Sequence, residues 1–207
     1  MNNVLRVRVS IRGTRPLFFH AFGPEAIPLD KRKERTGVAG HDPEEWRQTC
    51  LVNEEGRLYV TDQYIFSALR NGARYTKRGR KNLQSDVSAT LQCLDKIIFL
   101  DRWMPGFPQD QQCRVKELPA PPQDNMLPVY LDVRSVVNPS TKARNVRYRV
   151  VASVGWLCSF SISFDKTLLS RGEVEAIVRD TGQFVGLGSA RAIGMGRFEL
   201  INFEIAE

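Results

Sequence analysis

The chain has few side chains that bind metal ions. Only two histidines are present. The four cysteines are far apart and form no Cys-x-x-Cys pair: Cys50, Cys93, Cys113 and Cys158. Scattered cysteines are typical of reduced thiols in a cytosolic protein rather than of disulfides or a zinc site. We therefore expect no metal, no cofactor and a cytoplasmic location.

Long hydrophobic runs are also absent. No apolar stretch is long enough to span a membrane, and residues 1–6 lack the hydrophobic region of a signal peptide. The 207 residues are 42% hydrophobic and 26% charged, which is typical of a globular domain with a core. We expect one domain over residues 1–207 and no membrane partner.

Acidic residues are missing from three stretches of a basic chain. Lys and Arg number 30 against 23 Asp and Glu, so the formal net charge is +7. Such an excess favours a nucleic-acid partner, although many basic proteins bind none. The distribution of the charge is therefore more informative than its sum.

The first acid-free stretch, 70–81, follows a predicted helix. Apolar residues at helical spacing predict a helix from Thr61 to about Tyr75, with positions 70, 74 and 77 on one face. The stretch holds six cations: Arg70, Arg74, Lys77, Arg78, Arg80 and Lys81. Because Tyr75 lies among them, the pattern suits phosphates and stacked, unpaired bases. The alternative is a helix C-terminus whose cations only complement the helix dipole, but six cations exceed that need.

The second acid-free stretch, 133–164, is predicted to form an extended hairpin. Apolar or alternating runs at 129–137 and 147–164 flank a polar turn at 138–145. The stretch holds five cations: Arg134, Lys142, Arg144, Arg147 and Arg149. We expect the basic tip to contact nucleic acid; the alternative is a hairpin exposed only for solubility.

The third acid-free stretch, 186–198, has four glycines and two arginines. A helix at 170–181 precedes it, with a capping box of Ser170 and Glu173, and a strand at 198–205 follows it. This order excludes a dinucleotide-binding turn, in which the glycines follow a strand and precede a helix. The loop's N–H groups and Arg191 suit phosphate binding. The alternative is a long turn with glycines at tight corners.

The remaining elements predict an α+β fold. Residues 4–11 alternate as a strand with a basic outer face, and a second helix begins at Ser85. The apolar face expected for that helix is Val87, Leu91, Leu94 and Ile98. Long inserted loops fall at about 23–50 and 104–128. The order is compatible with a ferredoxin-like core, β-α-β-β-α-β, whose sheet is the platform of RNA-recognition (RRM-like) domains.

The glycine-rich stretch 186–198 resembles the C-terminal loop of the RAMP superfamily, the RNA-binding subunits and processing nucleases of CRISPR systems. The N-terminal strand and the small-x-Leu-Arg motif at 67–70 are also similar to that family. The hairpin at 133–164 resembles its protruding thumb. Residues 61–64 depart from the family, which has Pro-Gly-Ser-Ser before the helix.

The resemblance implies a backbone subunit of a CRISPR effector complex. Such subunits bind guide RNA (crRNA), assemble side by side along it, and serve target nucleic-acid recognition in antiviral defence. The implied partners are guide RNA, target nucleic acid, other copies of the chain and other effector subunits. The implied RNA-binding residues lie in the helix, the thumb and the loop: Arg70, Arg74, Lys77, Arg78, Lys142, Arg144, Arg147, Gly188, Arg191 and Gly194.

Whether the chain is an enzyme stays open at this point. In type III relatives a loop aspartate before the helix supports RNA cleavage, and Asp42, and less well Asp30, lies in the corresponding loop. The alternative is a guide-processing endoribonuclease using His20, because a histidine pKa is near neutral. Against it, His20 lies among phenylalanines, where histidines are commonly structural. A third possibility is a basic nucleic-acid binder unrelated to CRISPR.

Overall fold

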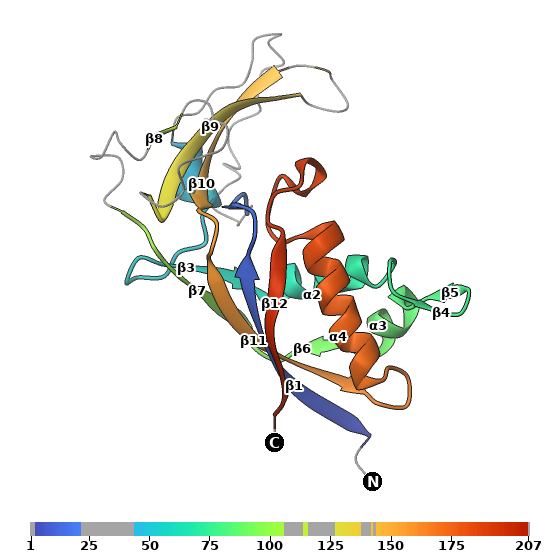
Figure 1. Ribbon diagram of the computed structural model, residues 1–207. Coiled ribbons are helices and arrows are strands. Elements are labelled where there is room, and N and C mark those ends of the chain that lie inside the picture. The colour runs from blue at the N-terminus through green and yellow to red at the C-terminus, as the bar shows by residue number, and fades with distance from the viewer. Residues whose placement is uncertain are drawn as a thin grey trace, which may run out of the picture.

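A computed structural model describes residues 3–21, 44–105, 114–115, 127–137, 142 and 144–206. These residues form an α+β fold with mainly antiparallel sheets, which confirms the predicted class. A main sheet carries helices on one face, and a second sheet projects from one end of it (Figure 1). Every helix within these ranges is too short or too polar to cross a membrane.

The main sheet has six strands. They are β1 (Val4–Gly13), β3 (Arg57–Thr61), β6 (Gln92–Cys93), β7 (Ile97–Trp103), β11 (Leu157–Asp165) and β12 (Phe198–Ile205). Their order is β12-β1-β11-β7-β3, and β6 also pairs with β11. The strands are antiparallel, so that Val7 of β1 lies opposite Ile162 of β11 and Ile205 of β12.

Three helices cover one face of the main sheet: α2 (Asp62–Gly72), α3 (Gln84–Thr90) and α4 (Arg171–Asp180) (Figure 1). The predicted alternation of β1 is confirmed, since Val7, Val9 and Ile11 are fully buried while its arginines are exposed. Each such side chain contributes about 1.5–3 kcal/mol on burial. The predicted capping box of Ser170 and Glu173 is present at the start of α4.

The chain order β1, α2, β7, β11, α4, β12 follows the strand–helix–strand–strand–helix–strand pattern. Strand β3 lies outside this pattern and extends the sheet beyond β7. The ferredoxin-like assignment itself stays a prediction.

Two helix boundaries differ from the sequence prediction. The sequence predicts a helix from Ser85 through Ile98, but α3 ends at Thr90, so the prediction is wrong beyond that residue. Residues 97–103 instead form β7, because they alternate between exposed and buried positions and are rich in β-branched and aromatic residues. Helix α2 ends at Gly72 rather than near Tyr75. At Gly72 a Cβ would lie 1.9 Å from Thr181 Oγ1, so the helix end packs directly against the segment after α4.

The second sheet consists of β2 (Leu17–Phe18), β10 (Arg144–Ala152), β9 (Val129–Val137) and β8 (Arg114–Val115), in that order. Strands β9 and β10 form the projecting hairpin (Figure 1). This hairpin is shorter than the predicted 133–164, because the chain turns at Gly155 (φ +84°) and β11 then joins the main sheet. The turn is anchored by fully buried Trp156, whose Nε1–H donates to the Arg15 carbonyl at 2.9 Å.

Candidate nucleic-acid interface

A groove of about 730 Å³ lies where the end of α2, the end of β2 and the glycine-rich loop meet. Residues far apart in the sequence line it, among them His20, Arg74, Tyr75, Phe184, Gly188 and Arg191. The fold therefore brings together three of the predicted RNA-binding residues and the predicted catalytic candidate His20. Among the described residues, no acid lines the groove.

The glycine-rich loop is held by tight contacts within the protein. Gly196 (φ +70°) lies against the backbone of Leu187, where a Cβ would be 1.9 Å from the carbonyl oxygen. The Leu187 N–H donates back to the Gly196 carbonyl at 2.9 Å. At Gly188 (φ +71°) a Cβ would lie 2.6 Å from the Phe18 carbonyl oxygen. The close approach expected of these glycines is present, but the protein's own backbone is what approaches.

The segment after Gly188, residues 189–192, lines the groove. The Ser189 N–H donates to the Phe18 carbonyl at 2.8 Å, which ties the loop to β2. Ala190 is left-handed (φ +59°), and a 3-10 turn, η4 (Arg191–Ile193), follows it. The N–H groups of Arg191 and Ala192 precede the first hydrogen bond of this turn, which Ile193 makes. Successive N–H groups in such a conformation form a concavity suited to an anion.

The basic stretch 70–81 leaves the helix at Gly72, earlier than the predicted end near Tyr75. Residues 77–82 form a short hairpin of β4 (Lys77–Arg78) and β5 (Lys81–Asn82). The expectation that positions 70, 74 and 77 share one helical face is therefore wrong, because the helix ends at Gly72.

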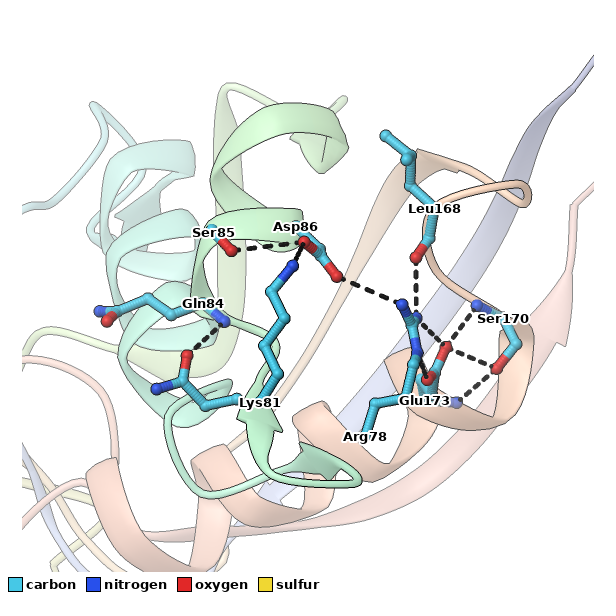
Figure 2. Close-up of polar contacts among 9 residues, drawn as sticks. Arg78, Lys81, Gln84, Ser85, Asp86, Leu168, Ser170 and Glu173 are labelled. Carbon is cyan, nitrogen blue, oxygen red and sulfur yellow. Dashed lines mark hydrogen bonds and ion pairs between the residues drawn. The ribbon is translucent and has the colours of Figure 1, made fainter.

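Part of this basic stretch is engaged within the protein (Figure 2). Arg78 Nε lies 2.6 Å from Glu173 Oε1, and Arg78 Nη1 lies 3.4 Å from Asp86 Oδ2. Lys81 Nζ lies 2.8 Å from Asp86 Oδ1. The hydrogen bond from Arg78 is the main reason why the pKa of Glu173 falls to about 2. Arg78, predicted as an RNA contact, thus joins β4 to α3 and α4.

The other cations of the stretch differ in their engagement. Arg70 Nε donates to Ser88 Oγ at 2.8 Å. Arg74, Lys77 and Arg80 are exposed and form no ion pair with any described residue. Arg191, which also lines the groove, likewise has no acidic partner in the described ranges. Arg74 and Arg191 therefore give the groove a positive charge that the described residues leave uncompensated.

Two aromatic rings lie exposed in the same groove. Tyr75 is 53% and Phe184 is 42% exposed. Their ring centroids are 5.0 Å apart at an interplanar angle of 37°. Phe184 belongs to a π-helical turn, η3 (Thr181–Val185), directly after α4. Sequence reasoning identified Tyr75 but missed Phe184, since nothing in the local sequence indicates that these two segments meet.

His20 lies just after β2 in the wall of the groove. Burial, followed by the nearby charge of Arg149, lowers its pKa to about 4. The imidazole is therefore neutral near neutral pH. Tyr64, from the first turn of α2, also lines the groove. Its pKa is raised by burial, and the nearby charge of Arg191 opposes part of that rise.

The projecting hairpin carries the other predicted contacts. Arg147 forms an ion pair with Glu45 of the short helix α1 (Glu45–Thr49), so it joins α1 to β10. Lys142 and Arg144, nearer the tip, are exposed.

Gly194 (φ +80°), a predicted contact in the glycine-rich loop, borders open space, since a Cβ there would meet no atom within 4 Å.

The two aspartate candidates, Asp30 and Asp42, lie outside the described residues. Within the described ranges, no three His, Cys, Asp or Glu side chains come together in a way that could hold a metal ion.

No protein-family model and no curated protein matches the chain. Among solved structures, the chain is similar to a chain of the "Cryo-EM structure of the Type III-B Cmr-beta bound to cognate target RNA". The identity is 14% and the TM-score is 0.49, over 99% of this chain and 61% of that one. The chain thus spans less than two thirds of the length of that neighbour.

Proposed function

We propose that the chain is a guide-RNA-binding backbone subunit of a CRISPR effector complex. The observation that carries the proposal is the groove itself, which is lined both by Arg74, just after α2, and by Arg191 of the glycine-rich loop. The RAMP-like order of strand, small-x-Leu-Arg helix, basic hairpin and glycine-rich loop supports the CRISPR assignment. Cations without acidic partners suit the phosphates of a nucleic-acid strand.

In this proposal the groove grips the RNA backbone without reading its sequence. Arg74 and Arg191 neutralise phosphates, and the rigid loop holds Arg191 in place. Lys77 and Arg80 lie on the β4–β5 hairpin beyond the groove and add to the attraction. Arg78 and Arg147 support the fold through their ion pairs.

The projecting hairpin provides the contact between neighbouring copies. Strands β9 and β10 project away from the main sheet (Figure 1). Arg144 is the first residue of β10, and Lys142 precedes it by two residues. In the proposed assembly, these two cations contact RNA held by the next subunit. Repetition of this contact arranges several copies along one guide RNA.

Charge reversal in the groove tests the proposal. We expect Arg74→Glu and Arg191→Glu each to weaken binding of single-stranded RNA by about tenfold or more, and to flatten its dependence on salt. The control is Arg12→Glu, on the face of the main sheet that the helices leave uncovered. Unchanged affinity in both groove variants would contradict the proposal.

A second candidate is a guide-processing endoribonuclease, favoured by one observation: His20 faces the same groove. A histidine whose pKa is about 4 is unprotonated near neutral pH and is a weak base there. His20 therefore has no proton to donate as a general acid and can act only as a weak general base. We rank this candidate second for that reason.

A further inference from the structure

The backbone near the exposed rings of Tyr75 and Phe184 is held by a hydrogen bond and by tight packing. The Tyr75 N–H donates to the Gly72 carbonyl at 2.9 Å, in the turn that ends α2. Beneath Phe184, Thr181 is fully buried, and a Cβ on Gly182 would lie 2.1 Å from the Phe198 carbonyl oxygen. The two rings therefore form a preorganised aromatic surface in the groove, although about half of each is left to solvent.

A second cavity continues the groove past Arg191. It has a volume of about 280 Å³ and shares Tyr64, Gly188 and Arg191 with the first. Its other lining residues, Gln63 and Ser67, come from the first half of α2. Arg191 thus lies at the junction of two spaces, of which one holds the aromatic pair and the other is lined by polar side chains.

We propose that these two cavities bind one dinucleotide step of single-stranded RNA. The base of the first nucleotide stacks on Tyr75 and Phe184, the linking phosphate lies on Arg191, and the second nucleotide occupies the smaller cavity. That the strand is a guide RNA rests on the function proposed above. The stacking itself requires only an unpaired base.

The chemistry of the groove favours this occupant. Every nucleobase has a π-face, so aromatic stacking accepts any sequence, whereas the bases of a duplex are already stacked on one another. An arginine side chain could also stack on the rings. Arg74 and Arg191 would repel it, and none of the described lining residues is an acid that could bind it. A strand with phosphates and unpaired bases satisfies both the cations and the rings.

The test compares two probes, a short oligoadenylate and an abasic ribose-phosphate strand of the same length. Phe184→Leu and Tyr75→Leu should each weaken oligoadenylate binding by about fivefold to a hundredfold, with an unchanged salt dependence. The same variants should bind the abasic strand as the unaltered chain does, since that strand has nothing to stack. Phe184→Trp should retain the affinity. Phe99→Leu, an exposed ring on the uncovered face of the main sheet, is the matched control.

Two further outcomes separate the two proposals. If both Leu variants bind oligoadenylate as tightly as the unaltered chain while Arg74→Glu binds it poorly, stacking is refuted and RNA binding in the groove stands. If the chain binds neither probe, both proposals fail. Equal loss of affinity for the two probes would also overturn stacking, because the rings would then act only through the shape of the groove.

Discussion

Arg78 Nε lies 2.6 Å from Glu173 Oε1, an ion pair that joins the β4–β5 hairpin to the first turn of α4. Glu173 Oε2 also accepts the Ser170 N–H at 2.8 Å in the capping box. One carboxylate therefore holds together two segments that are far apart in the sequence, and it starts α4 at the same time.

This carboxylate makes stability depend on pH. Because the pKa of Glu173 is lowered to about 2, its contribution is present above its unfolded value near 4.5 and is lost as pH falls toward 2. Glu173→Gln, which keeps a side chain able to cap, should lower the free energy of unfolding by about 1 kcal/mol near neutral pH. Urea denaturation of both proteins, near neutral pH and near pH 2, checks this prediction. A difference that persists unchanged below pH 2 would contradict the assignment.

His20 should give the protein a second, separate sensitivity to acid. The folded pKa of about 4 lies below the ordinary histidine value of 6.5, so the unfolded chain binds a proton first as pH falls. Stability should therefore fall as pH drops from 6.5 toward 4, and His20→Gln should remove this part of the decline. If the variant and the unaltered chain show the same decline in urea denaturation, His20 is not buried as described.

The same histidine distinguishes the binder from the nuclease. For a backbone subunit, we expect His20→Ala to leave the length and the ends of the bound guide RNA unchanged. Sequencing the RNA that co-purifies with each protein measures this. Accumulation of unprocessed precursor with the variant would favour the endoribonuclease.

Two glycines of one loop should respond differently to alanine. Both have positive φ, but a Cβ at Gly196 would lie 1.9 Å from the Leu187 carbonyl oxygen, whereas one at Gly194 would meet no atom within 4 Å. We expect Gly194→Ala to cost about 1 kcal/mol and Gly196→Ala to cost at least about 3 kcal/mol or to prevent folding. Thermal denaturation measures the loss of stability in each variant. Equal losses would contradict the prediction.

The tip of the projecting hairpin should govern assembly rather than RNA affinity. We expect the double variant Lys142→Glu, Arg144→Glu to fold and to bind a short RNA as one copy, but to fail to occupy a long RNA with several copies, because the like charges would repel the neighbour's strand. Particle mass on a long RNA measures the number of copies. Normal assembly would refute the role given to the tip, and Arg179→Glu on α4 is the control.

The elements with strong local signals could be predicted from the sequence. The alternation of β1 and the capping box of α4 depend on neighbouring residues, so the local pattern was sufficient. Helix α2 ends at Gly72, where the chain packs against Thr181 from a remote part of the sequence. The spacing of neighbouring residues does not indicate a contact between segments so far apart in the sequence.

The candidate site was predictable in part. The sequence identifies where cations are concentrated, and Arg74 and Arg191 do share a groove. It does not show which cations are paired, so Arg78 could not be separated from Arg74 before its contact with Glu173 was known. Phe184 was missed because its role depends on the approach of Tyr75 from a remote segment.

In the proposed assembly, several copies of this chain bind along one guide RNA. The most direct measurement is purification from the native host cell, sequencing of the co-purifying RNA, and the mass of the particle. We expect uniform short RNAs that share a repeat-derived end, in particles that hold several copies of the chain. A single copy on each RNA, or purification without RNA, would contradict it.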